Sequence, residues 1–267
     1  MDGMNSSRWK WLDDLLSQQQ GKVSCVYRNL VTGESYVYAG DAVHPSASVI
    51  KTFLMAYVFQ LIEDGKLTAA QQIPIRKEDM AISCGVLNYL KDVASLSVRD
   101  LTELMMIISD NAATNVLLSL VGMENMERYL KEDLKLKATS FQRRMMDLEA
   151  IAKGIQNYTS AEEVADLLEK IYRGEMVSKD ASALMLQILK EQQFDDLIPA
   201  YLSEFIPEYS IAHKSGGLDG VVHDAGIVDY GKEPFILCLF GSELPSTKPF
   251  GNAIGEIALR IYQMLQE

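Results

Sequence analysis

The apolar residues of this chain follow two different spacings, and the order of these spacings constrains the fold more than any other feature. Stretches with strand character occur near both ends, rich in Val and Tyr in the N-terminal part, whereas the long middle has the three- and four-residue spacing of helices. The strand patterns cover residues 22–30, 35–39, 210–214, 221–230 and 235–241. The first two flank Val31-Thr32-Gly33-Glu34, a turn sequence that predicts a β-hairpin.

Helical spacing predicts six helices in the middle of the chain and one near each end. The predicted helices cover residues 8–20, 48–64, 98–108, 111–120, 124–134, 160–172, 178–190 and 249–265. Two of them begin with the spacing of a capping box, which stabilises a helix N-terminus. These boxes pair Ser97 with Asp100 and Ser160 with Glu163.

This segregation of strands and helices predicts an α+β fold. Strands from both chain ends form one antiparallel sheet with flanking helices, and the middle forms an all-helical lobe. We expect a single domain over residues 1–267, with an α/β lobe of about 1–46 and 195–267 and a helical lobe of about 47–194. A cleft between two lobes is the natural place for an active site.

The charge balance of the chain is acidic. Its 267 residues include 25 lysines and arginines against 37 aspartates and glutamates, a formal net charge of −12. Nucleic acid and anionic membrane surfaces are therefore poor partners. The longest apolar stretches, such as 235–240, are far shorter than the roughly 18 residues of a membrane span. We expect a monomer that acts on a small-molecule substrate and binds neither nucleic acid nor a membrane.

The N-terminus and the cysteines bear on the compartment. Met1-Asp2-Gly3-Met4-Asn5 has no basic region followed by an apolar one, which predicts a cytoplasmic protein, or an extracellular or periplasmic one if a signal segment was removed. Cys25, Cys84 and Cys238 are widely spaced among apolar residues, so we expect buried, reduced thiols. Neither they nor the scattered histidines have metal-ligand spacing, and we expect no metal or other cofactor.

The first candidate for chemistry is Ser48-Val49-Ile50-Lys51. Residues three apart share one face of a helix, so the Lys51 amine can approach the Ser48 hydroxyl as its base. A helix N-terminus at Ser48 favours developing negative charge, and burial would lower the pKa of Lys51. His223-Asp224 could belong to a triad, but no serine stands in a G-x-S-x-G elbow, and we expect hydrogen-bonded structural histidines.

Two further triplets follow in order along the chain. Ser109-Asp110-Asn111 lies at a break between two apolar helices, and Lys214-Ser215-Gly216 lies at the end of a strand. Alone, each has an ordinary interpretation, as a helix N-cap or a strand-end turn. With Ser48-x-x-Lys51 they resemble the S-x-x-K, S-D-N and K-[T/S]-G signature of the class A serine β-lactamases and the related penicillin-binding proteins. The order of elements over nearly the whole chain suits the same fold.

The resemblance implies a serine hydrolase that opens β-lactam rings through an acyl-enzyme on Ser48. Lys51 would be the base, Ser109 the proton relay toward the leaving nitrogen, and Asp110 a residue that ties loops together. The substrate would be bound by Asn111 at its side-chain amide, by Lys214 and Ser215 at its carboxylate, and by the N–H groups of Ser48 and Gly217 as an oxyanion hole, with Gly216 allowing close approach of the strand.

One segment departs from the class A pattern. Those enzymes carry a glutamate in an E-x-x-L-N loop that activates the deacylating water, whereas the corresponding stretch here is Arg143-Arg144-Met145-Met146-Asp147-Leu148-Glu149-Ala150. Asp147 and Glu149 both offer a carboxylate, and we favour Asp147 as the base. An aspartate is one methylene shorter than a glutamate, and placement of a base matters at the sub-ångström level, so deacylation is the step most affected.

Two alternatives to a β-lactamase remain open at this point. A penicillin-binding type of peptidase or esterase would acylate Ser48 but release the product slowly. A relic of the fold would bind a ligand or partner without turnover, although the retention of Ser48, Lys51, Ser109, Asn111 and Lys214 argues against it. The substrate in the first two cases is a β-lactam or an acyl-peptide-like molecule.

Overall fold

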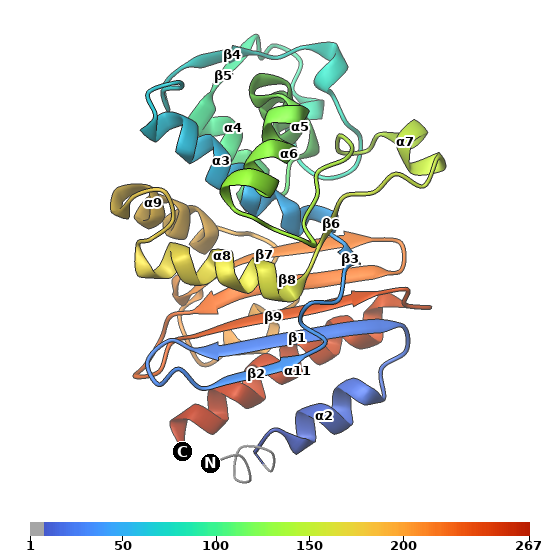
Figure 1. The fold of residues 1–267 in the computed structure, drawn as a ribbon, viewed down its shortest axis with the longest axis vertical. Coiled ribbons are helices and arrows are strands. Elements are labelled where there is room, and N and C mark those ends of the chain that lie inside the picture. Colours follow the sequence, from blue (N-terminus) through green and yellow to red (C-terminus); the bar gives the residue numbers. More distant parts are fainter. Residues whose placement is uncertain (1–7) are drawn as a thin grey trace.

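A five-stranded antiparallel sheet runs through the middle of the molecule, as the computed structural model of residues 8–267 shows (Figure 1). Its order is β2-β1-β9-β8-β7, so β1 from the N-terminal hairpin pairs along its full length with β9 from the C-terminal part. The strands are β1 (Lys22–Asn29), β2 (Ser35–Tyr38), β7 (Ile211–Leu218), β8 (Val221–Val228) and β9 (Phe235–Ser242). The predicted hairpin and the antiparallel sheet built from both chain ends are confirmed. The five N-terminal residues inspected for a signal segment lie outside the described residues.

The sheet separates two hydrophobic cores. Successive side chains of a strand point to opposite faces, and β9 illustrates this. Phe235, Leu237 and Leu239 pack toward helices α2 (Lys10–Ser17) and α11 (Thr247–Gln266), whereas Ile236, Cys238 and Phe240 join the core of the helical part. Figure 1 shows α2 and α11 on one side of the sheet and α8 and α9 on the other. Because both faces are covered, every residue of β9 is buried.

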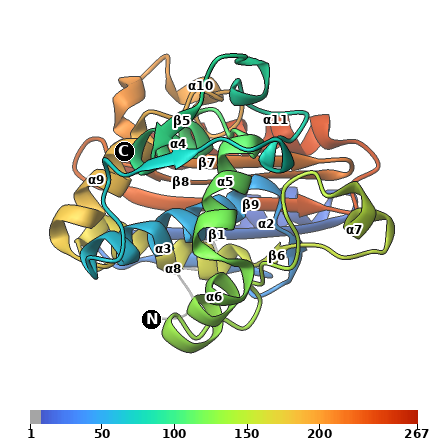
Figure 2. The ribbon, with the colours of Figure 1, turned by 90° about the horizontal axis from the view of Figure 1, so that it is seen from above.

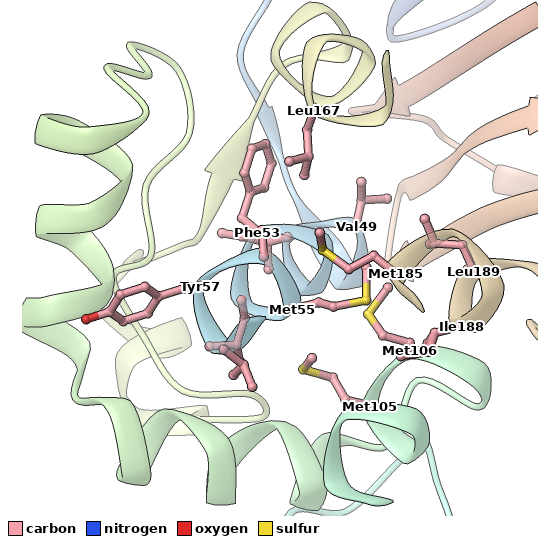
Figure 3. Close-up of a cluster of buried hydrophobic side chains, with 14 of the residues drawn as sticks. Val49, Phe53, Met55, Tyr57, Met105, Met106, Leu167, Met185, Ile188 and Leu189 are labelled. Carbon is pink, nitrogen blue, oxygen red and sulfur yellow. The ribbon is translucent and has the colours of Figure 1, made fainter. Parts of the chain in front are cut away.

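The helical part surrounds one central helix. The helices are α3 (Lys51–Glu63), α4 (Val98–Ile107), α5 (Asn111–Val121), α6 (Met123–Arg128), α7 (Leu148–Ala152), α8 (Ala161–Arg173) and α9 (Lys179–Lys190), whereas the short α10 (Pro199–Leu202) packs on α11. All residues of α3 from Lys51 to Val58 are buried. Figure 3 shows α3 packed against methionines of α4 and against Leu167 and Met185 of α8 and α9. The apolar surroundings hold the first turn of α3, and Lys51 with it, in a fixed position.

Local sequence signals at helix starts are confirmed in one case and corrected in another. The Ser97–Asp100 capping box is present in both directions. At Ser160 the hydroxyl accepts the N–H of Glu163, but the Glu163 carboxylate does not return the bond. It accepts instead the backbone N–H groups of residues 137, 138 and 139, 2.6 to 2.9 Å away. The predicted box was therefore wrong in its second half, because a distant loop offered that carboxylate three donors.

Several short elements were not predicted from the sequence. Two-stranded sheets pair β3 (His44–Pro45) with β6 (Tyr158–Thr159) and β4 (Gln72–Pro74) with β5 (Ser95–Ser97). The predicted helix 124–134 divides into α6 and a π-helical turn at Tyr129–Asp133. Turns of 3₁₀ helix occur at Ala47–Ile50, Lys77–Asp79, Leu87–Tyr89 and Glu208–Ser210. None of the helices described is long and apolar enough to cross a membrane.

Candidate active site

The three motifs meet at one cavity of about 380 Å³. Six residues singled out from the sequence line it: Ser48, Ser109, Asn111, Ser215, Gly216 and Gly217. Lys51 and Lys214 are fully buried behind its wall. The other lining residues are Ser46, Ala47, Ser83, Cys84, Arg143, Met145, Met146, Asn157, Phe194, Asp196, Leu197, Leu218 and Val222. Spacing along the chain could not identify this second group, because most of its members come from loops.

Ser48 stands in the 3₁₀ turn Ala47–Ile50, immediately before α3. Ala47 has a left-handed backbone, with φ of 45°, which turns the chain so that Ser48 faces the cavity. Strand β7 packs directly against this turn at Gly216. A Cβ atom built there would lie 2.9 Å from the backbone nitrogen of Ser48. Only glycine allows this approach, so Gly216 fixes the distance between β7 and the serine.

Lys51 holds the Ser109-Asp110-Asn111 turn. Its Nζ donates to Ser109 O at 2.7 Å, to Ser109 Oγ at 3.0 Å and to Asn111 Oδ1 at 2.9 Å. These three bonds use the three donors of an ammonium group, and the hydrogen bonds of the described residues include none from Lys51 to Ser48 Oγ. The expected direct approach is not made, because Ser109 and Asn111 take all three donors of the Lys51 amine. Burial, followed by the positive charge of Lys214, lowers the pKa of Lys51 well below its usual 10.5.

Asp110 ties two loops to the site, as predicted. Its Oδ1 caps α5 by accepting the N–H of Ala113 at 2.9 Å. Its Oδ2 accepts the N–H groups of Val86 and Leu87 at 2.7 and 2.8 Å. The loop that contains Cys84 is thereby held over the cavity. Cys84 is consequently only part-buried, so the expectation of three buried thiols is wrong for this residue and holds for Cys25 and Cys238.

Lys214 is the second buried cation of the site. Its Nζ donates to the backbone oxygen of Ser215 at 2.9 Å. Burial lowers the pKa of Lys214 to about 8, although the carboxylate of Asp224 acts in the opposite direction. Ser215, only 9% exposed, follows it on β7 and lines the cavity. The middle of β7 therefore offers an incoming carboxylate a hydroxyl beside a buried amine. The predicted strand end at this triplet was wrong, because β7 stays paired with β8 as far as Leu218.

Backbone strain is concentrated around the cavity. Eight non-glycine residues of the described chain have positive φ, and four of them line this cavity: Ala47, Ser83, Ser109 and Met146. Such conformations cost roughly 1–3 kcal/mol each and persist where the surrounding structure demands them. Their positions support the assignment of this cavity as the functional site.

The segment with the departing sequence presents Arg143, Met145 and Met146 to the cavity, and neither Asp147 nor Glu149. Asp147 caps α7, where its Oδ1 accepts the N–H of Ala150 at 2.9 Å. The Glu149 side chain is 81% exposed and pairs with Lys153. Figures 1 and 2 both show α7 at the outer edge of the molecule. Among the described lining residues Asp196 is the only carboxylate. The structure thus does not bring Asp147 into the cavity with Ser48.

The histidines are hydrogen-bonded away from the cavity. His213 Nδ1 and Asp224 are 3.0 Å apart, both buried, and the Asp224 carboxylate also accepts the N–H of Ile198. His223 Nε2 donates to Pro45 O at 2.8 Å, and its Nδ1 accepts the N–H of Gly241. The ring nitrogens of His44 each lie 2.8 Å from a serine hydroxyl, Ser24 and Ser242, so all three histidines have structural roles, as expected. The described residues contain no group of three or more His, Cys, Asp or Glu side chains placed to hold a metal.

Comparison with known proteins agrees with this geometry. The family model described as the beta-lactamase enzyme family matches residues 7–265. Beta-lactamase SME-1 of Serratia marcescens is 22% identical over 240 residues, which are 86% of this chain and 79% of that protein. The solved structure of PBP-A is 26% identical with a TM-score of 0.88, over 98% of this chain and 96% of PBP-A.

A second PBP-A structure, that of a single-substitution mutant, is an acyl-enzyme complex with penicillin G. It has the same identity and TM-score, over 98% of this chain and 97% of that one. The α+β fold expected from the resemblance is the fold of these relatives. From its motifs, its fold and these matches, the chain belongs to the beta-lactamase enzyme family.

Proposed function

We propose that this protein is a serine enzyme that β-lactams acylate on Ser48, and that it hydrolyses the acyl-enzyme slowly, in the manner of a penicillin-binding protein. One observation carries the first half of the proposal. A buried lysine with three hydrogen bonds to Ser109 and Asn111 stands beside a serine that faces the same cavity. This is the arrangement of a nucleophile with its own proton-transfer group.

Acylation proceeds by attack of Ser48 Oγ on the β-lactam carbonyl. The serine proton passes to the Lys51 amine, and Ser109, 3.0 Å from Lys51 Nζ, returns a proton to the leaving nitrogen as the C–N bond breaks. The N–H groups of Ser48 and Gly217 stabilise the oxyanion. Asn111 binds the side-chain amide, and Lys214 with Ser215 binds the substrate carboxylate.

The low pKa of Lys51 suits this role. A lysine in water is charged at neutral pH and cannot accept a proton, whereas burial beside Lys214 disfavours the charged form. Loss of one proton frees a lone pair on Nζ, and the Ser109 hydroxyl then becomes a donor toward it. The same lysine can therefore move a proton in either direction without a histidine.

Slow deacylation follows from the composition of the cavity wall. Hydrolysis of the ester needs a water held by a base, and removal of a general base typically costs about 10²- to 10⁴-fold in rate. The segment that departs from the class A pattern gives the wall Arg143, Met145 and Met146 and no carboxylate, while Asp147 is engaged in capping α7. The one carboxylate among the described lining residues, Asp196, comes from the segment that follows α9. The β-lactamase alternative, with Asp147 as the deacylation base, requires that cap to open toward the cavity.

A chromogenic cephalosporin followed both by colour and by intact mass tests the proposal. We expect one stoichiometric burst of colour and a stable adduct that is absent from Ser48→Ala. Continued colour without an adduct would identify an efficient β-lactamase and contradict the slow step. If the protein gives no colour and forms no adduct, it is a binding protein without turnover. If an adduct still forms in Ser48→Ala, Ser48 is not the nucleophile.

A further inference from the structure

We propose that Asp196 selects substrates that carry an ammonium or other cationic group. This inference rests on the proposed function, because it concerns the substrate of the same cavity. Among the described residues that line the cavity, Asp196 is the only acidic one, and it is exposed. None of the hydrogen bonds and ion pairs of the described residues uses its carboxylate. A substrate cation is therefore free to pair with it.

The position of Asp196 is fixed by its neighbours in the chain. Ile198 N donates to Asp224 Oδ2 on β8 at 3.0 Å. The Leu197 backbone oxygen lies against α11 at Gly255, where a Cβ atom would come within 3.0 Å of it. On the other side, Gln193 N donates to Ile107 O at the end of α4. A segment anchored at three points holds the carboxylate at the cavity wall.

The other charges of the site make this carboxylate selective. Arg143 lines the cavity, and Lys214 is buried behind its wall. These cations attract the carboxylate of a substrate and repel an ammonium group. Asp196 makes one place on this positively charged wall negative. A substrate that carries both a carboxylate and a cationic group therefore has a favourable contact for each of its charges. Since an exposed ion pair contributes about 1 kcal/mol or less, we expect a cationic substrate to be acylated about 2- to 5-fold faster than its neutral analogue.

Asp195 provides a matched control. It is exposed like Asp196, but it lines a different cavity together with His213 and Tyr209. Asp195→Asn and Asp196→Asn change the net charge equally, so general attraction of cations to an acidic protein changes equally in both. Only a local contact with the substrate distinguishes the two variants.

The experiment measures second-order acylation rate constants for probes that differ in one charge. Ampicillin carries an ammonium group on the acyl side chain, where benzylpenicillin is neutral and carbenicillin is anionic. Cephaloridine carries a pyridinium on the leaving side, where cephalothin carries a neutral acetoxy group. These two series distinguish which end of the substrate meets Asp196.

In at least one series, Asp196→Asn should lower the rate ratio of cationic to neutral probe by about 2- to 5-fold, and Asp195→Asn should leave it unchanged. The effect should shrink in 0.5 M salt, because exposed charges are screened. Unchanged ratios in both series, or equal changes in both variants, would overturn the role of Asp196 while leaving acylation intact. Failure of every probe to acylate the unmodified protein would overturn the proposed function, and this inference with it.

Discussion

Asn115 and Met145 hold each other by two hydrogen bonds. Asn115 Nδ2 donates to Met145 O at 3.1 Å, and Met145 N donates to Asn115 Oδ1 at 2.8 Å. Asn115 is buried in α5, one helical turn after Asn111. Asn111, which binds Lys51, and Asn115, which positions Met145, thus lie on one face of α5. An apolar side chain is thereby fixed in the cavity that contains the nucleophile.

Met145→Glu should convert slow release into turnover. The backbone anchors of residue 145 do not depend on its side chain, so a glutamate placed there enters the cavity as a base. We expect deacylation to accelerate about 10²-fold, at the lower end of the range typical of general-base catalysis. Steady-state hydrolysis of a chromogenic cephalosporin measures this change. Met145→Gln, which has the same shape without the charge, should stay slow, and equal rates for both variants would contradict the idea.

Asp147→Asn and Glu149→Gln test the sequence-based choice of deacylation base. Because both side chains lie outside the cavity lining, we expect the acyl-enzyme lifetime to stay within about twofold of the unmodified protein in both variants. Asparagine can still accept the N–H of Ala150, so the cap of α7 is retained. Intact mass against time measures the lifetime. A lifetime lengthened by about 10²-fold or more in Asp147→Asn alone would establish Asp147 as the base.

Gly216→Ala should disturb the nucleophile, whereas Gly217→Ala should not disturb the fold. A Cβ atom at residue 216 would meet Ser48 N at 2.9 Å, but one at residue 217 would meet only Val221 O, at 3.8 Å. We expect Gly216→Ala to cost about 1–3 kcal/mol in stability, as overpacking does. Its acylation of Ser48 should slow at least 10-fold. Thermal melts and adduct formation measure the two effects, and equal behaviour of the two variants would contradict this assignment.

The charge of Lys214 should limit acylation at alkaline pH. The pKa of Lys214 is lowered to about 8 by burial, and only the charged amine attracts a substrate carboxylate. The acylation rate constant for an anionic β-lactam should therefore fall as the pH rises through about 8. Lys214→Met should react slowly at all pH values and should lack this alkaline decline. An alkaline limb that survives in the variant would assign the titration to another group.

His44 and His223 should make the fold less stable in mild acid. Burial lowers their pKa values to about 3 and about 4, whereas an unfolded histidine titrates near 6.5. Above pH 6.5 both are neutral in either state, and their stabilising contribution is complete. Between pH 6.5 and about 4 the unfolded chain binds protons that the folded one does not. Each histidine then costs up to about 1.4 kcal/mol per pH unit.

Urea unfolding between pH 7.5 and 5.0 measures this decline, because most carboxylates remain ionised over that range. The free energy of unfolding should stay level down to about pH 6.5 and then fall. Below pH 6.5, His223→Gln should reduce the slope of the unfolding free energy against pH. The reduction corresponds to at most one proton fewer taken up on unfolding. A free energy that stays constant from pH 7.5 to 5.0 would contradict the prediction.

The sequence by itself determined the elements and the three motifs, because both are local. Apolar spacing identified the five strands and the principal helices, and a serine with a lysine three residues later marked the start of α3. The Ser109-Asp110-Asn111 triplet, placed just before an apolar helix, could be interpreted as a helix N-cap for the same reason, whereas the loop-tying role of Asp110 came from the resemblance. Ser48, Ser109 and Asn111 could be assigned to one site only through the resemblance, since nothing local joins residues 60 positions apart.

The tertiary structure decided which side chains meet. Residues that are neighbours in the chain are not always partners in the fold, and the reason is physical. His223 and Asp224 are neighbours in β8, so their side chains point to opposite faces of the sheet. Asp224 lies opposite Ser215 in the register and therefore pairs with His213, two residues earlier on the same face of β7. In the same way, Met145 is held by Asn115, 30 residues earlier in the chain, so Met145 lines the cavity and Asp147, the residue that chemistry favoured, does not. Each polar group took the partner that the packed backbone brought within reach, and the sequence does not encode that distance locally.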